Sequence, residues 1–322
     1  MTLAVEEAAA ILCGGGLVAF PTETVYGLGA DAANPEAVAR IFAAKGRPAN
    51  HPVIVHLGSA EQLTDWATDI PPAAYRLAQQ FWPGPLTLIL KRHARVSDAV
   101  TGGQDTVGLR VPGHPIALAL LAAFSGGIAA PSANRFGRIS PTTAAHVRDE
   151  LGASVDFVLD GGPCRVGIES TILDLSGDHP RLLRPGEITA AEIETVLGEP
   201  FVAPTGETPR SPGMLPSHYA PQTALTLVSP DQLPGEIKRC LEGGERVSVL
   251  ARSAAPTLTN CIWQVMPDDP GAYAHELYAR LRELDALHVD RLIVEAPPRE
   301  AAWLAVQDRL ARAAHSGIDP RH

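Results

Sequence analysis

Short apolar runs alternate with stretches of helical spacing along the first 200 residues. In one such stretch Asn34 supplies an N-cap and Pro35 occupies the first turn, while Val38, Ile41 and Phe42 recur on one helical face. We therefore expect an α/β domain with a mixed, twisted sheet. The predicted strands are 17–20, 52–57, 86–90, 107–111, 128–130, 157–159, 170–175 and 182–183, and the predicted helices are 34–45, 72–81, 114–124, 142–151 and 189–197.

Two local signals mark the ends of helices. Thr189 and Glu192 match a capping box, in which each side chain bonds the other residue's backbone N–H group. The run Gly14-Gly15-Gly16 precedes a predicted strand rather than a helix, so we expect a helix C-cap and a turn there. The P-loop, GxGxxG, HExxH and GxSxG motifs do not occur in the sequence.

Residues 201–221 interrupt the alternation. Five prolines fall in this segment and exclude a regular element, which predicts an extended, semi-rigid linker. The chain is thus expected to form a domain over 1–200, a linker over 201–221 and a smaller Rossmann-like α/β domain over 222–322, with a parallel sheet and right-handed crossovers. In that last domain the pattern predicts strands at 225–228, 247–250 and 292–295 and helices at 234–241, 272–287 and 301–314.

Composition and charge narrow the class of function. The chain has 322 residues, is 45% hydrophobic and carries a net charge of −10, which excludes wholesale disorder and does not favour tight nucleic-acid binding. The four cysteines show no CxxC spacing, which indicates reduced thiols and a cytoplasmic protein. The apolar stretch 8–20 follows two glutamates and is broken by glycines, so it makes a poor signal peptide. The sequence contains no uninterrupted run of about 18 apolar residues, so we do not expect a membrane-spanning helix.

Four cations in the first domain occupy positions that suit an anionic ligand. Lys45 and Arg47 lie two residues apart at a predicted helix end, where they are placed to grip a polyphosphate. The alternative is that they only stabilise the helix C-terminus. Arg110 and Arg184 each lie in an apolar strand, which is costly unless the guanidinium meets an anion. For Arg110 the alternative is an internal salt bridge.

Small hydroxyl and amide residues follow several of the predicted strands. Residues 131–134, Pro-Ser-Ala-Asn, form a loop of the kind that binds ligands at strand ends in α/β domains. Ser140 and Thr142 follow, and N-capping of the next helix by either of them is an alternative that is compatible with ligand binding. Residues 21–29 and 169–172 add further hydroxyls. Together with the four cations, these residues predict a nucleotide-triphosphate site beside a small polar substrate, without a protein nucleophile.

Six motifs resemble the YrdC-type domain family in order and spacing. They are PTETVYGLG (21–29), KGRP with HPVIVH (45–48 and 51–56), LRVPGHP (109–115), PSAN with SPT (131–134 and 140–142), ESTI (169–172) and LRPG (183–186). The linker SPGMLPSHYAP (211–221) and the α/β tail resemble the longer, two-domain form of the L-threonylcarbamoyladenylate synthases. The resemblance implies a YrdC-like sheet in the first domain.

The resemblance also implies a reaction. L-threonine, bicarbonate and ATP give threonylcarbamoyl-AMP and pyrophosphate, which is a nucleotidyl transfer. Separate transferase proteins then move the threonylcarbamoyl group to the adenosine next to the anticodon of tRNA. Such a step needs placement and charge neutralisation rather than a covalent intermediate. Mg²⁺ is expected on the phosphates of ATP, and no metal site built by the protein itself is expected.

Site residues follow from matching the motifs position by position. Lys45 and Arg47 are expected to be catalytic and to meet the phosphates. Further ATP-binding residues are expected at His51, Arg110, Asn134, Ser140 and Arg184, with His218 or Tyr219 of the linker closing over the nucleotide. The pocket for threonine and the carbamate is expected to be lined by Thr24, His56, His114, Ser132 and Ser170.

Three other functions remain open on the sequence alone. A carbamoyl-transfer domain of hydrogenase maturation has the same fold, but such proteins carry zinc-finger modules and this chain has no CxxC pairs. An RNA-binding module is disfavoured by the acidic charge and the low aromatic content. A catalytically silent paralogue is disfavoured because Lys45, Arg47, Ser132 and Asn134 are all present.

Overall fold

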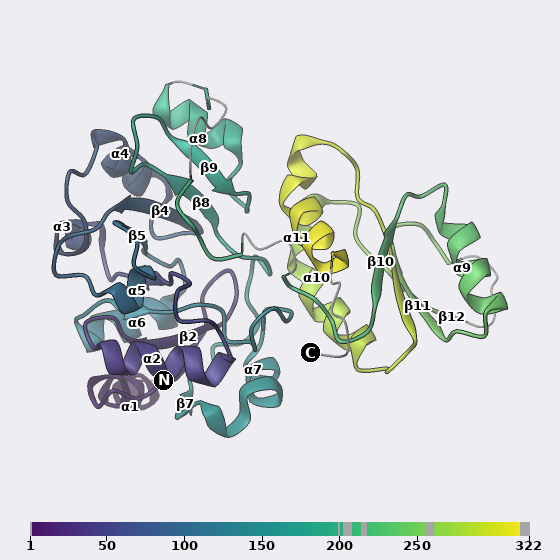
Figure 1. Cartoon of the computed structure of the whole chain (residues 1–322), viewed down its shortest axis with the longest axis horizontal. Coiled ribbons are helices and arrows are strands. Elements are labelled where there is room, and N and C mark those ends of the chain that lie inside the picture. Colours follow the sequence, from purple (N-terminus) through teal and green to yellow (C-terminus); the bar gives the residue numbers. More distant parts are fainter. Residues whose placement is uncertain (1, 199, 202–207, 214–217, 256–260, 316–322) are drawn as a thin grey trace. The chain divides into compact units, whose positions relative to one another are not determined.

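The computed structural model describes residues 2–198, 200–201, 208–213, 218–255 and 261–315. The chain divides into two compact units (Figure 1). Unit 1 comprises Met1–Phe136 and Ser140–Met214, and unit 2 comprises Gly137–Ile139 and Leu215–His322. The change from one unit to the other falls inside the segment predicted as a linker, of which residues 202–207 and 214–217 lie outside the described residues.

Unit 1 is built on one mixed sheet. Within the described residues its nine strands run in the order β7-β1-β2-β6-β3-β5-β4-β8-β9. Three neighbouring pairs, β1–β7, β3–β5 and β4–β8, are parallel, and the others are antiparallel. The predicted mixed sheet is therefore confirmed. The strands are β1 (Val18–Phe20), β2 (Gly27–Asp31), β3 (Ile54–His56), β4 (Leu86–Lys91), β5 (Thr106–Arg110), β6 (Ile128–Ala129), β7 (Phe157–Val158), β8 (Thr171–Asp174) and β9 (Arg181–Arg184).

Capping side chains define several helices of this unit. The side chain of Asn34 accepts hydrogen bonds from the N–H groups of Glu36 and Ala37, and the capping box of Thr189 and Glu192 is complete. The helices are α1 (Thr2–Cys13), α2 (Pro35–Lys45), α3 (Leu63–Trp66), α4 (Pro72–Phe81), α5 (Asp98–Thr101), α6 (Pro115–Phe124), α7 (Ala144–Leu151) and α8 (Ala190–Leu197), with 3₁₀ turns η1 (Ala60–Gln62) and η2 (Gly152–Ser154).

The N-cap of α7 corrects one prediction. Thr143 caps this helix by accepting a hydrogen bond from the N–H group of His146, so the assignment of that role to Ser140 or Thr142 was wrong. The Ser140 hydroxyl instead donates to a carboxylate, as described below. Four consecutive residues with hydroxyl groups or proline, Ser140 to Thr143, precede the helix, and their identities do not reveal which one adopts the extended cap conformation.

Several elements of unit 1 were not predicted, among them helices α1, α3 and α5 and strand β2. Helix α1 ends in the glycine run, where Gly15 has a φ of +77° and the Gly16 N–H group bonds the carbonyl of Ile11, as a C-cap and turn require. Strand β2 is rich in glycine and alanine, which have low strand propensity. A Cβ atom on Gly29 would lie 2.8 Å from Phe20 and from Ile128, so close packing against neighbouring strands defines β2.

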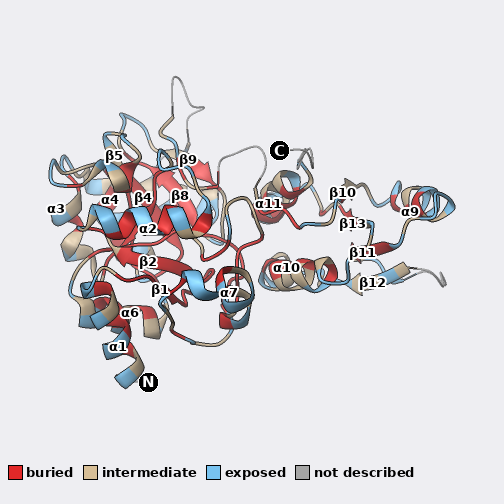
Figure 2. Cartoon of the chain, turned by 60° about the horizontal axis from the view of Figure 1, so that its bottom comes forward, coloured by how far each residue is buried: buried red, intermediate tan, exposed pale blue. Residues whose placement is uncertain are grey.

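Alternate residues of β1 belong to two separate apolar clusters. Buried residues run along the strands of unit 1 (Figure 2). Val18 and Phe20 of β1 belong to a cluster with residues of α1 and α6. Ala19, between them, belongs to the larger cluster, which includes residues of α2, α4, α7 and α8. Because successive side chains of a strand point to opposite faces, helices cover both faces of the sheet at this strand.

Unit 2 contains a small parallel sheet, as predicted. Its described strands run in the order β10-β13-β11-β12, and every neighbouring pair is parallel. Strand β12 was not predicted, and the helix expected over 301–314 begins with a 3₁₀ turn. The elements are β10 (Leu225–Val228), α9 (Leu233–Glu242), β11 (Val247–Ala251), β12 (Cys261–Val265), α10 (Pro270–Asp285), β13 (Arg291–Glu295), η3 (Ala301–Trp303) and α11 (Leu304–Ala314).

Candidate active site

The buried ammonium group of Lys45 ties the end of α2 to the loop 131–136. Lys45 Nζ donates to the carbonyl of Ser132 at 2.5 Å and to that of Asn134, and the Phe136 N–H group bonds the Lys45 carbonyl at 2.9 Å. Burial, followed by the charge of Arg47, holds the pKa of Lys45 well below its usual value. Lys45 therefore holds the loop 131–136 against the end of α2. The sequence analysis had considered only phosphate binding or stabilisation of the helix C-terminus for this residue.

Arg47 and His51 extend this cationic region along the next turn. Gly46 adopts φ +62° at the helix C-cap, which redirects the chain after α2. Arg47 Nη2 donates to the Pro52 carbonyl at 2.8 Å. The His51 ring meets the edge of Phe136 with centroids 5.4 Å apart, and burial and Arg47 lower the pKa of His51. A neutral His51 keeps both a donor and an acceptor for a ligand.

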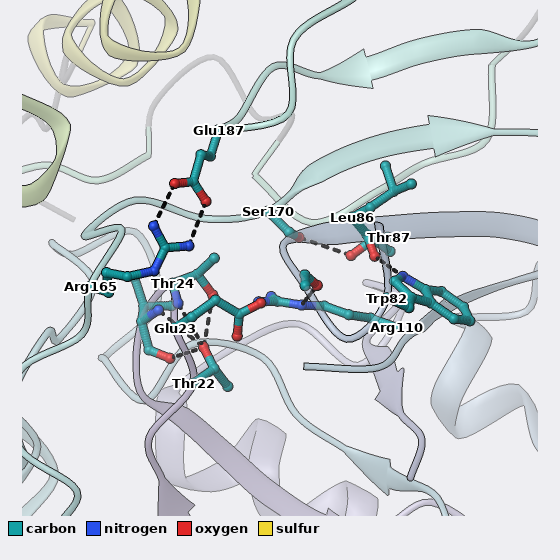
Figure 3. A network of polar contacts seen from close by, with 12 residues as sticks. Thr22, Glu23, Thr24, Trp82, Leu86, Thr87, Arg110, Arg165, Ser170 and Glu187 are labelled. Carbon is teal, nitrogen blue, oxygen red and sulfur yellow. Dashed lines mark hydrogen bonds and ion pairs between the residues drawn. The ribbon is translucent and has the colours of Figure 1, made fainter. Parts of the chain in front are cut away.

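Arg110 forms a buried ion pair with Glu23 (Figure 3). Arg110 Nη2 lies 2.7 Å from Glu23 Oε1, and both side chains are only 4% exposed. Arg110 Nε donates to the Gly84 carbonyl at 3.2 Å. The alternative of an internal salt bridge, which the sequence left open for Arg110, is thus confirmed. The sequence did not assign Glu23, although it is the one charged residue of the motif 21–29.

Arg184 and Ser170 form a second buried network. Arg184 Nε donates to the Ser170 carbonyl at 3.0 Å, and Arg184 Nη2 donates to the Ser170 hydroxyl at 3.1 Å. That hydroxyl also lies 2.8 Å from the hydroxyl of Thr87 (Figure 3). Arg184 Nη1 donates to the Pro212 carbonyl at 2.9 Å. One guanidinium thus connects strand β9, the start of β8 and the described part of the linker region that belongs to unit 1.

Ser140 and Asn134 lie at the two ends of the loop that passes through residues 137–139. The Ser140 hydroxyl donates to Glu169 Oε1 at 2.5 Å, and both side chains are buried. Asn134 Nδ2 donates to the Arg135 carbonyl at 2.7 Å. Glu169, like Glu23, is a buried carboxylate that the sequence analysis did not select, because a single glutamate in a motif carries no signal of its partner.

The two predicted histidines of the threonine pocket differ in environment. His56 stands opposite Arg110 in the parallel pair β3–β5, and its ring meets the edge of Phe20 at 5.8 Å. Burial, followed by the charge of Arg110, lowers the pKa of His56 to about 3. His114 is half-buried and caps α6 by accepting a hydrogen bond from the Ile116 N–H group. Burial lowers the pKa of His114 as well.

Thr24 and Ser132 complete the predicted threonine pocket. The Thr24 hydroxyl lies 2.8 Å from that of Thr22, which donates to the Val25 carbonyl at 2.6 Å. Ser132 forms an isolated antiparallel bridge with Gly27, so its loop runs beside the segment that carries Thr24. Main-chain hydrogen bonds therefore bring the motifs 21–29 and 131–134 together.

Comparisons with known proteins decide the family. A family model described as "Telomere recombination" matches residues 10–186, and one described as the C-terminal domain of threonylcarbamoyl-AMP synthase matches residues 188–315. The threonylcarbamoyl-AMP synthase of Pyrococcus abyssi is 42% identical over 96% of this chain and 93% of its own length. The chain belongs to the threonylcarbamoyl-AMP synthase family. The Bacillus subtilis member is also 42% identical, over 96% of this chain and 92% of its own length.

A solved structure agrees with this family along nearly the whole chain. It is the crystal structure of the Pyrococcus abyssi Sua5 protein complexed with L-threonine, with a TM-score of 0.90 and 40% identity. The match covers 98% of this chain and 95% of that one. The predicted fold, a YrdC-like first domain with a smaller C-terminal α/β domain, is confirmed for this family member.

His218 and Tyr219, the predicted linker contacts of the nucleotide in this family member, lie in unit 2. Tyr219 adopts a left-handed backbone with φ +63° and is buried, with its ring stacked on Tyr278 at 5.8 Å. The Arg309 guanidinium lies 5.3 Å from the Tyr219 ring, and the His218 ring meets the ring edge at 4.2 Å. Their role at the nucleotide stays a prediction.

Neither a metal-binding cluster nor a membrane-spanning helix occurs among the described residues. No group of three or more His, Cys, Asp or Glu side chains there is arranged to hold a metal ion. None of the helices in that part of the chain has the length and apolar character needed to cross a membrane.

Proposed function

We propose that this chain makes threonylcarbamoyl-AMP from L-threonine, bicarbonate and ATP, with release of pyrophosphate. The observation that carries the proposal is the set of buried cations in unit 1, Lys45, Arg110 and Arg184, each held by main-chain carbonyls or a carboxylate. The threonylcarbamoyl-AMP synthases that match 96% of the chain support the assignment, and so does the L-threonine complex of the Pyrococcus abyssi protein.

The reaction is a nucleotidyl transfer. The neutral amine of threonine attacks carbon dioxide derived from bicarbonate, forms a C–N bond and loses a proton, which leaves a carbamate. A carbamate oxygen then forms a bond to the α-phosphorus of ATP, and the bond from that phosphorus to pyrophosphate breaks. Charge develops on the phosphates during this step, so fixed cations lower its barrier without a nucleophile from the protein. Burial raises the pKa of the Cys164 thiol to about 12, which suits a reaction that uses no thiolate.

The residues of unit 1 divide between two ligands in this proposal. Lys45 and Arg47 neutralise the phosphates, with His51, Asn134, Ser140 and Arg184 around the nucleotide. Thr24, His56, His114, Ser132 and Ser170 surround threonine and the carbamate. A neutral His56 accepts or donates a hydrogen bond to the substrate without adding positive charge, because its pKa lies near 3.

Mg²⁺ enters in this proposal with ATP and is held mainly by phosphate oxygens. The buried carboxylates of the site are Glu23, which pairs with Arg110, and Glu169, which accepts a hydrogen bond from Ser140. The ion would supply charge neutralisation on the phosphates when bound.

The product is passed on rather than used on the protein. Separate transferase proteins carry the threonylcarbamoyl group to tRNA in the cytoplasm, and the net charge of −10 suits a protein that does not itself clamp nucleic acid. The four cysteines are free thiols, which supports the cytoplasmic assignment.

Product formation from isotope-labelled substrate tests the proposal. The full chain is incubated with ATP, Mg²⁺, L-threonine and ¹³C-bicarbonate, and the mixture is analysed by mass spectrometry for threonylcarbamoyl-AMP that carries the label. We expect labelled product from the native chain and from an Arg165→Ala control, and none from Lys45→Ala. If the native chain turns over ATP in the complete mixture but forms no labelled threonylcarbamoyl-AMP, the proposal is contradicted.

A further inference from the structure

The small sheet of unit 2 ends in strand β12, which has a neighbouring strand on one side only. Strand β12 pairs with β11 and is the last in the order β10-β13-β11-β12 of the described strands. The Met266 N–H group, just after β12, bonds the Ala251 carbonyl of β11 at 2.8 Å. Because main-chain groups alternate in direction along a strand, the groups of every second residue of β12 face β11 and the others face outward. The outward-facing residues are Cys261, Trp263 and Val265.

Exposed apolar side chains distinguish β12 from the other edge strands. The described edge strands β7, β9 and β10 contain no exposed residue, whereas Ile262 and Val265 of β12 are 46% and 50% exposed. In Figure 2, β12 accordingly lacks the red of buried residues. Edge strands are usually protected by a charged residue, a proline or a bulge, and β12 has none of these. The strand is thus an exposed template for pairing with a further strand.

An apolar groove lies next to β12 on the face of the sheet that α9 covers. Cys261 and Trp263 pack against the cluster that includes Leu233 and Ile237 of α9. The groove has a volume of about 720 Å³ and is lined mainly by apolar side chains, among them Leu241 and the half-buried Trp263. Covering apolar surface of this kind is favourable. A strand added to β12 would bring its own side chains to the mouth of this groove.

The outward groups of β12 are arranged symmetrically about Trp263, as pairing with a second copy of the strand requires. In an antiparallel pair, a residue whose N–H and C=O groups both face outward bonds the residue directly opposite. A two-fold axis at Trp263 pairs this residue with its own copy and pairs Cys261 with Val265 of the second copy. The Val265 carbonyl accepts from Gln264 Nε2 at 3.2 Å in the single chain and would exchange this bond for a main-chain N–H group.

The charge of this edge favours a second copy over a charged partner. Two copies that meet at a two-fold axis bring identical residues together, and like charges directly opposite destabilise a strand pair. The chain carries a net charge of −10, but the sequence from Ser253 to Pro267 contains no charged residue. At the groove, Lys238 and Glu242 compensate one another, with Nζ and Oε1 3.7 Å apart. Two acidic chains can therefore meet at β12 without repulsion between facing side chains.

We propose that two copies of this chain associate through β12, with the strands antiparallel about Trp263 and the two small sheets joined into one. The Ile262 and Gln264 side chains of both copies then lie together on one face. On the other face, Trp263 of the second copy lies at the groove beside α9. The interface is small, because each copy contributes one strand and one groove, so the dimer forms reversibly and depends on concentration. No residue of the candidate active site takes part, so the inference does not depend on the proposed function.

Sedimentation equilibrium of the full chain, with a reductant to keep the thiols free, tests the proposal between about 1 and 500 µM. We expect the average mass to rise from that of one chain toward that of two. Ile262→Lys puts a cation of each copy on the same face of the paired strands and removes apolar contacts there, so association should weaken at least about tenfold. Leu287→Lys is the matched control, at a residue of unit 2 that is 44% exposed and lies outside the strands, and it should leave association within about twofold of the native value.

A pair of opposite charges tests the register of the two strands. With the axis at Trp263, residue 262 of one copy lies opposite residue 264 of the other. The double variant with Ile262→Lys and Gln264→Glu places opposite charges directly across from one another, so it should associate at least about threefold more tightly than Ile262→Lys alone. Association no tighter than that of the single variant would overturn the pairing about Trp263. Circular dichroism checks that each variant is folded.

Hydrogen exchange of the native chain locates the contact without any substitution. We expect peptides that contain residues 261–265 to exchange more slowly at about 200 µM than at about 1 µM, and the change to be confined to the β12 edge and the groove. This measurement decides the matter if Ile262→Lys does not fold. A chain that stays monomeric up to about 500 µM would overturn the proposal, whatever else binds this edge. So would a dimer whose β12 amides exchange equally fast at both concentrations, because it would use another surface.

Discussion

Protonation of His56 should limit the stability of unit 1 in acid. The pKa of His56 is about 3 in the folded chain because of burial and Arg110, against about 6.5 for an exposed histidine. The unfolded chain therefore binds a proton between these values and the folded chain does not, so stability is full above pH 6.5 and is lost as the pH falls toward 3. At about 1.4 kcal/mol per pH unit, the loss reaches about 2 kcal/mol at pH 5.

Replacement of His56 by glutamine isolates this contribution. The variant keeps a neutral polar side chain but cannot take up the proton, so other groups titrate equally in both proteins. Urea-dependent hydrogen exchange of peptides from β3 and β5 reports on unit 1 alone. We expect the native chain to lose about 2 kcal/mol more than His56→Gln between pH 7.5 and pH 5. Equal losses in the two proteins would refute the assignment of a depressed pKa to His56.

Three further predictions concern activity and stability. Lys45→Ala removes two charged hydrogen bonds to the loop 131–136, so pyrophosphate release measured in a coupled assay should fall about 100-fold or more. Arg165→Ala removes an exposed ion pair with Glu187, so the free energy of unfolding measured in urea should change by less than about 0.5 kcal/mol and product formation should not change. Deletion of residues 215–322, which keeps the contacts of Arg210 and Pro212 within unit 1, should leave unit 1 folded by circular dichroism but impair synthesis; full activity in the truncated chain would contradict the predicted role of His218 or Tyr219 at the nucleotide.

The sequence predicts those elements whose local signals and burial agree. Helix α4 begins and ends at the predicted residues, and α2 and α8 carry the predicted caps. Strands of branched and large apolar residues, such as β4, are recognised because composition and burial point the same way.

The sequence analysis did not predict elements that form mainly because of packing against neighbouring strands and helices. Strand β2 consists of small residues and forms because Phe20 and Ile128 pack where a larger side chain at Gly29 would clash. Helix α1 is rich in alanine and apolar on several sides, so periodicity gives a weak signal there. Strand β12 lies at the sheet edge with exposed Ile262 and Val265, and an alternating apolar pattern is absent.

The cations of the site were visible in the sequence, but their partners were not. Arg110 stood out because an arginine in an apolar strand requires an anion. Its anion, Glu23, lies far away along the chain, and only the folded structure pairs the two. The same holds for Ser140 and Glu169. The carbonyl contacts of Lys45 are made by backbone atoms, which leave no trace in residue identity.

Pyrophosphate release from ATP by the purified full chain tests the central claim most directly. The rate is measured with L-threonine and bicarbonate together, with each alone and with neither, in the presence of Mg²⁺. We predict that release needs both substrates and is lost in Lys45→Ala. Release at the same rate without threonine, or no release from a folded chain supplied with all substrates, would contradict the assignment.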